Sequence, residues 1–284
     1  MCDFNNKKYR DMLKEKKRIV VKIGSSSLTY PETGFLNLAK IERLVRVLCN
    51  LRNSGRDVVL VSSGAIAVGR KTLSMDKKPD ELSKYQACAA VGQGYLIATY
   101  QKIFAEYNQL VAQILMTKYT MLHDENRMNA RNTFEELFKL GVIPIVNEND
   151  TITTDEIQFG DNDKLSAIVS SVIEADLLIL LSDIDGLYTD DPNLDKNASF
   201  IDLVPVIDSN LKKMGKSTNK TDLGTGGMAA KIVAAQIATN SGTDMVITNA
   251  SDVVNVTRIM SGENIGTLFL AHRNEDFDLV EAIS

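Results

Sequence analysis

The chain has 284 residues, of which 44% are hydrophobic and 24% are charged. These proportions are close to those of an average globular protein, so the sequence excludes wholesale disorder and is long enough to bury a large core, as one domain or as two lobes of one architecture. The formal net charge of −5 argues against a nucleic-acid-binding or membrane-binding protein that acts through a broad basic face.

The first predicted strand, Arg18 to Ile23, carries one lysine, Lys22, in an otherwise apolar run. It is followed at once by Gly24-Ser25-Ser26-Ser27, and a strand that runs into such a loop can present several backbone N–H groups to phosphate oxygens. The loop lacks the Gly-Lys-Ser/Thr ending of a Walker A motif. A lysine that protects an edge strand from aggregation is the alternative, but the loop beside it favours a functional lysine.

The second predicted strand, Asp57 to Val61, ends in a run of mostly small residues, Ser62 to Gly69. It follows a helix that Asn37 can cap and that Gly55 ends. Small residues let a ligand approach the backbone, and they let the next helix begin there with its positive end toward the ligand. Tight packing of that helix on the sheet selects the same residues, so both interpretations stay open.

A long helix, Ser83 to Tyr107, is predicted next, although the sequence Gly92-Gln93-Gly94 weakens its middle. That sequence lacks the third glycine of a dinucleotide fingerprint, so it predicts no cofactor site. A strand at Leu110 to Met116 and a helix at Met128 to Leu140 follow.

Two clusters of carboxylates and amides follow the next strand, Val142 to Val146. The first is Asn147 to Asp150, and the second, Asp161 to Asp163, opens a helix predicted for Lys164 to Ile173. Both clusters cannot lie in an apolar core, because unpaired buried charge is too costly. Solvated turns are one interpretation, and a polar ligand site at the carboxyl end of a sheet is the other. The segment between them, Thr151 to Gln158, alternates enough to form a small hairpin.

The last third of the chain repeats the pattern. A strand that is apolar on both faces, Leu177 to Leu181, ends in Ser182-Asp183. A glycine-dense segment, Leu223 to Lys231, opens a helix that runs to about Asn240, and such a loop forms an anion cradle with the lysine about one turn inside the helix. Two further strands are predicted, at Asp244 to Thr248 and Thr267 to Leu270.

Strands and helices therefore alternate along the whole chain. This order predicts an α/β fold: a three-layer α-β-α sandwich with a mostly parallel open sheet and helices on both faces. Strand after strand ends in small, polar or acidic residues. Because ligands of open α/β sheets bind at the carboxyl ends of the strands, we expect these residues to form a ligand site there.

Several motifs occur in a characteristic order. They are Val21-Lys22-Ile23-Gly24-Ser25, Ser62-Ser63-Gly64-Ala65-Ile66-Ala67, Asn129-Ala130-Arg131-Asn132-Thr133, Pro144 to Asp150, Gly160 to Ala167, Asp183 to Tyr188 and Gly224 to Met228. Together they resemble the glutamate 5-kinases, a family of the amino acid kinase superfamily, over roughly residues 17 to 272. Gly-Ser after the first-strand lysine differs from the Gly-Gly of acetylglutamate kinases and aspartokinases and from the Ser-Gly-Glu of uridylate kinases.

The resemblance implies an amino acid kinase-like sandwich that forms a single domain over residues 1–284. It would have an amino-acid-binding lobe at about residues 17–175 and a nucleotide-binding lobe at about 176–272. Many bacterial members add a C-terminal PUA domain, and the expectation here is that none follows. The implied reaction is ATP-dependent phosphorylation of the γ-carboxylate of L-glutamate to L-glutamyl 5-phosphate, the first step of proline biosynthesis.

The resemblance also implies roles for individual residues. Lys22 and Lys231 would contact the nucleotide phosphates, and Asp163 would hold both ammonium groups, which makes these three the catalytic residues. The ATP-binding residues would be Lys22, Gly24, Ser25, Ser182, Asp183, Thr225, Gly226, Gly227, Met228, Ala229, Ala230 and Lys231. The glutamate-binding residues would be Ser63, Gly64, Ala65, Asn147, Asp150, Asp161 and Asn162. Ser182 stands where threonine is expected and keeps the hydroxyl group.

ATP and Mg²⁺ are the implied cofactors, with the metal held mainly through ATP rather than by protein side chains. Further expectations from the resemblance are a homodimer or homotetramer, feedback inhibition by proline, and transfer of the labile product to the next enzyme, glutamyl phosphate reductase. No nucleic-acid or membrane partner is expected. The alternatives are another kinase of the superfamily, acting on acetylglutamate or carbamate, and a non-catalytic amino-acid or nucleotide sensor.

The few histidines and cysteines argue against several other classes of protein. With only two histidines, His123 and His272, a zinc site or a Ser-His-Asp triad is disfavoured. The three cysteines are widely spaced and fit no ligand pattern, as in a protein of a reducing compartment. The N-terminus has no apolar signal-peptide core, and apolar runs such as Leu177 to Leu181 are far too short to span a bilayer. We therefore expect a cytoplasmic protein.

Overall fold

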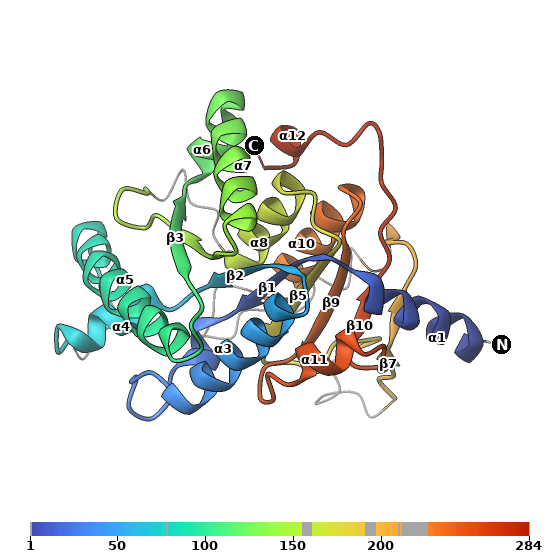
Figure 1. Ribbon diagram of the computed structural model, residues 1–284, viewed down its shortest axis with the longest axis horizontal. Coiled ribbons are helices and arrows are strands. Elements are labelled where there is room, and N and C mark those ends of the chain that lie inside the picture. The colour runs from blue at the N-terminus through green and yellow to red at the C-terminus, as the bar shows by residue number, and fades with distance from the viewer. Residues whose placement is uncertain are drawn as a thin grey trace.

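An eight-stranded sheet forms the middle layer of the computed structural model, which describes residues 2–75, 77, 79–154, 161–190, 197–209, 211 and 227–283 (Figure 1). From one edge to the other its strands are β3 (Val111–Met116), β4 (Ile143–Glu148), β2 (Asp57–Ser62), β1 (Arg18–Ile23), β5 (Leu177–Ser182), β9 (Asp244–Asn249), β10 (Thr267–Phe269) and β8 (Leu203–Val204). Neighbouring strands are parallel except β9 and β10, which are antiparallel. The predicted mostly parallel open sheet is confirmed.

Strand β1 lies in the interior of the sheet, between β2 and β5. Ile19, Val21 and Ile23 belong to the core on one face of the sheet, and Val20 belongs to the core on the other. By the alternation of a strand, Lys22 shares the face of Val20. The interpretation of this lysine as the guard of an edge strand is therefore wrong.

Helices cover both faces of the sheet (Figure 1). One core is closed by α3 (Leu38–Asn53), α5 (Leu82–Ala105) and α11 (Asn255–Met260). The other is closed by α7 (Asp124–Lys139), α8 (Asn162–Val172), α10 (Met228–Asn240) and α12 (Leu279–Ile283). Strand β5 is buried along its whole length and supplies apolar side chains to both cores, as predicted. The predicted three-layer α-β-α architecture is confirmed.

Short polar or glycine residues start the helices that border the carboxyl edge of the sheet. Asn37 Oδ1 accepts a hydrogen bond from the backbone N of Lys40 at 3.0 Å, which caps α3 as predicted. Asp161 caps α8 in the same way through the backbone N of Asp163 at 3.0 Å. Gly64 precedes α4 (Ala65–Thr72) with a φ of +106°, a conformation that residues with a Cβ rarely adopt.

Helices α4 and α5 touch backbone to backbone. A Cβ added at Gly69 would lie 1.8 Å from the carbonyl oxygen of Cys88, and one added at Gly92 would lie 1.7 Å from that of Ala65. Only glycine fits at either position. The tight packing considered for Gly69 is therefore found, but against a second helix rather than the sheet. Gly92 lowers the helix propensity of α5 but permits this contact.

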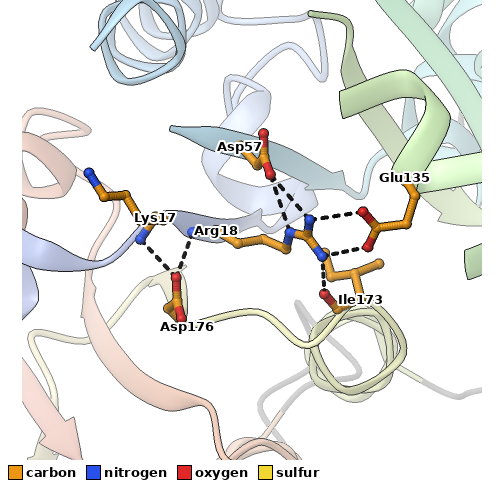
Figure 2. Close-up of polar contacts among 6 residues, drawn as sticks. All are labelled: Lys17, Arg18, Asp57, Glu135, Ile173 and Asp176. Carbon is orange, nitrogen blue, oxygen red and sulfur yellow. Dashed lines mark hydrogen bonds and ion pairs between the residues drawn. The ribbon is translucent and has the colours of Figure 1, made fainter. Parts of the chain in front are cut away.

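Arg18 joins four elements at the amino end of the sheet (Figure 2). Its guanidinium donates to Asp57 Oδ2 at 3.3 Å, to Glu135 Oε1 at 2.6 Å and to the carbonyl oxygen of Ile173 at 2.6 Å. It also lies 4.7 Å from the centre of the Phe138 ring. These contacts tie β1 to β2, α7 and the end of α8.

Asp176 reinforces the same region from the start of β5. Its Oδ2 accepts hydrogen bonds from the backbone N–H groups of Lys17 and Arg18, both at 2.8 Å (Figure 2). The strand that carries Lys22 is thus fixed at its amino end by Asp57 and Asp176 at the start of the neighbouring strands and by α7 and the end of α8 on one face of the sheet.

An N-terminal helix that the sequence did not predict, α1 (Cys2–Met12), packs at the far edge of the sheet (Figure 1). Arg10 holds it there with a side chain that is only 1% exposed. Its guanidinium donates to the carbonyl oxygens of Ile265 and Gly266 at 2.7 Å and to that of Asp202 at 2.8 Å. The buried charge is therefore matched by three acceptors.

Several boundaries differ from the predicted ones. Strand β4 continues through Asn147 and Glu148, because both side chains are buried beside the neighbouring strands rather than solvated in a turn. The remaining short elements, none of them predicted, are η1 (Leu13–Glu15), α2 (Ser25–Leu28), α6 (Lys118–Leu122), β6 (Leu187–Tyr188), β7 (Phe200–Ile201) and β8. The second half of the hairpin predicted at Thr151 to Gln158 lies outside the described residues, and Thr151 to Thr154 contain a turn but no strand.

Candidate active site

Several of the polar residues predicted to bind ligands lie together at the carboxyl end of the sheet, where its parallel strands end. Lys22, Asn147 and Ser182 lie near the ends of β1, β4 and β5, and Ser63 follows β2 directly. These four strands are adjacent and parallel. Their ends therefore bring together residues that are far apart in the sequence.

One carboxylate bridges two ammonium groups at the centre of this edge. Lys22 Nζ lies 2.6 Å from Asp163 Oδ1, and Lys231 Nζ lies 3.2 Å from Asp163 Oδ2. The lysines come from β1 and from the first turn of α10, and the aspartate comes from the first turn of α8. All three are buried, with exposures of 7%, 6% and 1% for Lys22, Lys231 and Asp163.

The charges in this bridge stabilise one another. Burial alone would lower the pKa of Lys22, but the carboxylates of Asp163, Asp161 and Asp183 together raise it above its ordinary value. Burial alone would raise the pKa of Asp163, but the two lysines outweigh it, and the pKa is lowered. The lysine and the aspartate are therefore both ionised at neutral pH.

Asp161 lies beside the bridge but is less well satisfied. Its Oδ1 is 4.0 Å from Lys22 Nζ and caps α8, whereas its buried Oδ2 has no hydrogen-bond partner among the described residues. Burial and the charge of Asp163 raise the pKa of Asp161, although Lys22 opposes them. A buried carboxylate oxygen without a partner suits a hydrogen-bond donor or a cation supplied by a ligand.

A chain of side-chain amides lies on the other side of the bridge. Asn162 Nδ2 donates to Ser63 Oγ and to Asn147 Oδ1, both at 2.8 Å. Asn147 Nδ2 in turn donates to Gln93 Oε1 at 2.8 Å. Residues from the loop after β2, from β4, from α8 and from α5 thus form one network.

The loops after β1 and β2 lie side by side. The backbone N of Ser63 donates to the carbonyl oxygen of Ile23 at 3.1 Å. A Cβ added at Gly64 would lie 3.8 Å from Ser25 Cα, and one added at Gly24 would lie 3.6 Å from Lys22 Nζ. The start of α4 is therefore held next to the start of α2, the short helix that the predicted Gly-Ser loop forms after Lys22.

Asp150 lies in the turn after β4 and is partly buried. Burial raises the pKa of its carboxyl from 3.8 to about 6. No charged or hydrogen-bonding group among the described residues offsets this effect. The carboxylate is thus poised to gain from a cationic ligand group.

Some of the residues predicted to bind ATP lie in the described part of the chain. Ser182 is buried and donates from Oγ to Asp183 Oδ1 at 2.9 Å, whereas Asp183 is exposed. Gly227 caps α10 without a side-chain hydrogen bond, and Met228 to Ala230 form its first turn next to Lys231. Thr225 and Gly226 lie outside the described residues.

Three residues of α5 that contact this region were missed in the sequence. Gln93 is buried and accepts from Asn147, and Tyr100 lies 2.9 Å from Ser62 Oγ through its hydroxyl group. Gln86, on the same helix, donates to the carbonyl oxygen of Thr153 at 3.2 Å. The signal that could have found them is polar residues at positions 86, 93 and 100, seven apart along a helix with an apolar core face.

Among the described residues, no cluster of three or more histidine, cysteine, aspartate or glutamate side chains is arranged to hold a metal ion. Asp161 nevertheless offers, next to the lysine bridge, one carboxylate oxygen without a hydrogen-bond partner in the part of the chain that the structure describes. Mg²⁺ in phosphoryl-transfer sites is commonly held by one or two carboxylates together with the phosphates of the substrate. The donor set therefore fits a metal ion that arrives with a nucleotide.

None of the helices in the described part of the chain has the length and apolar composition that crossing a bilayer requires.

Comparison with known proteins gives the class that this fold and site define. The family model of the amino acid kinase family matches residues 17–249, and the chain belongs to that family. It is similar to the glutamate 5-kinase of Carboxydothermus hydrogenoformans, with 50% identity over 268 residues that cover 94% of this chain and 72% of that protein. It is similar to the glutamate 5-kinase of Clostridium tetani, also with 50% identity, over 94% of this chain and 98% of that protein. The resemblance seen in the motifs is thus confirmed.

Solved structures agree on the fold. UMP kinase from Bacillus anthracis aligns with a TM-score of 0.61 at 15% identity, over 90% of this chain and 96% of that one. An isopentenyl phosphate kinase aligns with a TM-score of 0.59 at 16% identity, over 89% and 99% of the two chains. At this identity the likeness concerns the fold alone.

Proposed function

We propose that the protein transfers the γ-phosphoryl group of ATP to the γ-carboxylate of L-glutamate, giving L-glutamyl 5-phosphate and ADP. The observation that carries the proposal is the buried bridge of Lys22, Asp163 and Lys231 beside the amides of Asn147 and Asn162. Relatives that are 50% identical to this chain over 268 aligned residues are named glutamate 5-kinases, which supports the same activity. The product would enter proline biosynthesis at its first step.

The two lysines can offset the main barrier to this reaction, the repulsion between two anions. A γ-carboxylate with an ordinary pKa of about 4.3 arrives ionised, so it needs no general base. Two unit anions about 3.5 Å apart repel each other by about 5 kcal/mol at an effective dielectric constant of about 20. Lys22 and Lys231 would offset this repulsion, and Asp163 holds both ammonium groups in place without having to titrate.

In this reaction an oxygen of the γ-carboxylate forms a bond to the γ-phosphorus, and the bond from that phosphorus to the β–γ bridging oxygen breaks. The leaving oxygen stays with ADP as an anion. Both negative oxygens therefore need cations or N–H donors near them in the transition state. The two buried lysines supply the charge, and the first amides of α10 would supply donors.

Glutamate would bind on the side of the amide chain. Its α-ammonium would meet Asp150, Asp161 and the oxygens of Asn147 and Asn162. A carboxylate of glutamate would meet the Ser63 hydroxyl group and the backbone N–H groups of Gly64 and Ala65 at the start of α4. The raised pKa of Asp150 and the unpartnered oxygen of Asp161 support this placement.

ATP would bind on the side of α10. Gly24, Ser25, Ser182 and Asp183 would border it together with the segment from Thr225 to Lys231. On this division, residues of about 17–175 form the amino-acid-binding lobe of a single domain, and residues of about 176–272 form the nucleotide-binding lobe.

Mg²⁺, when bound with ATP, would neutralise phosphate charge, and it would be held mainly by the phosphates. Asp161 is the carboxylate next to which it would lie, because Asp163 is taken by the two lysines. The proposal also includes assembly as a homodimer or homotetramer, feedback inhibition by proline, transfer of the acyl phosphate to glutamyl phosphate reductase, and a cytoplasmic location.

The test is ADP release by the purified chain with ATP and Mg²⁺, comparing L-glutamate, N-acetylglutamate and no acceptor. Hydroxylamine added to the reaction converts an acyl phosphate into a stable hydroxamate. Glutamate-dependent ADP release with matching hydroxamate is the expected result. Turnover with N-acetylglutamate instead would assign another kinase of the superfamily, and folded protein that binds ATP but is silent with every acceptor would indicate a sensor.

A further inference from the structure

Helix α5 presents one polar face to the segments that carry the proposed glutamate-binding residues. Seven residues make nearly two helical turns, so Gln86, Gln93 and Tyr100 share this face. Each bonds to a different segment: the turn after β4, β4 itself, and the end of β2. Gln93 is the member whose hydrogen bonds continue into the site.

The hydrogen bonds of this network run from Asn162 through Asn147 to Gln93, whose oxygen is the last acceptor. Because Gln93 offers its oxygen, Asn147 must donate with its amino group, which leaves the oxygen of Asn147 to accept from Asn162. Both hydrogens of the Asn162 amino group are then used, one on Asn147 and one on Ser63. At the Asn162 end this leaves Asn162 Oδ1 as an acceptor and the hydroxyl hydrogen of Ser63 as a donor.

Burial makes a reversal of these hydrogen bonds costly. Gln93 is 8% exposed and Asn147 is 4% exposed. An amide that loses its partner at such positions is not compensated by bulk water, so a reversed Asn147 would leave an amino group facing another amino group. While Gln93 keeps its oxygen toward Asn147, this acceptor on α5 favours the observed orientation of Asn147 and Asn162 over the reversed one.

We propose that Gln93 is a positioning residue that sets the polarity of the acceptor site. It makes Asn162 present an oxygen to the α-ammonium of the amino acid and makes Ser63 present a hydrogen to a carboxylate. The site thereby selects an acceptor with a free amino group over the same dicarboxylate without one. This inference rests on the proposed function and names the source of its substrate preference.

The discriminating substrate is glutarate, which is glutamate without the amino group. Gln93→Met keeps the length of the side chain and removes the acceptor, whereas Gln93→Glu keeps an acceptor oxygen in the same place. For Gln93→Met we expect kcat/KM for glutamate to fall about tenfold relative to that for glutarate, with the KM for ATP unchanged. Gln93→Glu should keep most of the preference for glutamate over glutarate.

Two further variants guard against a general loss of structure. Leu96→Val alters the buried core of the same helix and should leave the preference unchanged. Gln93→Asn keeps the amide but draws it away from Asn147, so it should reproduce the loss of preference even where Gln93→Met does not fold. Circular dichroism establishes which variants are folded.

The outcomes separate this inference from the function on which it rests. A wild-type chain without glutamate-dependent turnover would overturn both. An active wild-type chain whose folded Gln93 variants all keep the glutamate preference would overturn the positioning role alone. A parallel rise of the KM values for ATP and glutamate, or an equal loss in Gln93→Met and Gln93→Glu, would reduce Gln93 to a structural residue.

Discussion

Asp163 pairs with two lysines from separate elements, closely with Lys22 at 2.6 Å and as an ion pair with Lys231 at 3.2 Å. Lys231 is the member that α10 brings in from the second half of the chain. Replacing Lys231 with Met keeps an unbranched side chain of similar length and removes the charge, while Lys22 still pairs with Asp163. The fold should therefore survive the change.

For Lys231→Met we expect kcat to fall by about 10²–10³, the usual effect of losing one preorganised donor to the transition state. The measurement is glutamate-dependent ADP release by protein whose thermal unfolding matches the wild type. Lys139→Met is the matched control, because Lys139 pairs with Glu136 on the surface and both are well exposed. Near-full turnover in Lys231→Met would remove this lysine from the catalytic role.

Asp150 links pH to both stability and binding. Its pKa is about 6 in the folded chain and 3.8 without the fold, so the folded state binds this proton more tightly. Protonation of Asp150 therefore stabilises the folded state at low pH, and this contribution to the unfolding free energy is lost as the pH rises through about 4 to 6. Above that range the buried carboxylate costs about 3 kcal/mol.

Asp150→Asn removes this cost because the amide does not titrate. The unliganded variant should be more stable than the wild type at pH 8, and the difference in unfolding free energy should shrink to about half at pH 5. In the same variant the KM for glutamate should rise, since no charge remains to pair with the ammonium group. Urea unfolding at both pH values and steady-state kinetics test the two statements; a variant that is less stable at pH 8 contradicts the first.

At the scale of the helix, α5 offers two glycines with opposite expected effects. At Gly92 an added Cβ would lie 1.7 Å from the carbonyl oxygen of Ala65, whereas at Gly94 nothing lies within 4 Å. Gly92→Ala should separate α4 from α5 and destabilise the chain by about 3 kcal/mol or more. Gly94→Ala should stabilise it by about 0.5–1 kcal/mol through helix propensity alone.

Denaturant unfolding of the two glycine variants gives the comparison directly. Glutamate turnover adds a second readout, because α4 begins at the proposed amino-acid site and α5 carries Gln93. Gly92→Ala should raise the KM for glutamate, and Gly94→Ala should leave it unchanged. Equal stability of the two variants would show that the helices adjust to each other more freely than their contact suggests.

The sequence predicted elements better than contacts between them. Apolar runs that end in small or acidic residues predict the strands β1, β2, β4 and β5 and the glycine loops. A long helix was also recognised at α5, but its glycines and glutamine were given no role. Their purpose depends on α4 and β4, which approach α5 only in three dimensions.

For the whole molecule, the two ends of the sheet have different tasks. The carboxyl end carries the lysine bridge, and the amino end carries the contacts of Arg18 (Figure 2). Arg18→Met should lower the free energy of unfolding by about 2–3 kcal/mol, because it leaves Asp57, Glu135 and the carbonyl of Ile173 without their donor. The partial exposure of the two carboxylates keeps the effect from being larger.

Arg131→Met is the control for this change. Arg131 pairs with Glu174 at 3.0 Å, but both side chains are about half exposed, so the pair contributes little. Below its unfolding temperature Arg18→Met should keep its KM values for glutamate and ATP. A loss of substrate affinity in folded Arg18→Met would mean that the two ends of the sheet are coupled.

The resemblance to a family supplied what pattern alone left open. Spacing and composition placed acidic clusters and a lysine at the carboxyl edge but left solvated turns as an equal alternative. The fold decides between them, because Asp163 is 1% exposed and lies between two lysines. No local feature of the sequence reveals that residues 22, 163 and 231 meet, since β1, α8 and α10 are joined only by the topology of the sheet.

The helix before the first strand has a practical meaning for anyone who handles this protein. Its polar, lysine-rich sequence invites removal as a tail, and shortening the chain to begin at β1 would be a natural choice for crystallisation. Such a trimmed chain would lose Arg10 and with it the donor to the carbonyl groups of Asp202, Ile265 and Gly266, which lie just before β8 and β10. Each buried acceptor left without its donor costs about 1–3 kcal/mol, so trimming would trade an apparent tail for a less stable end of the sheet.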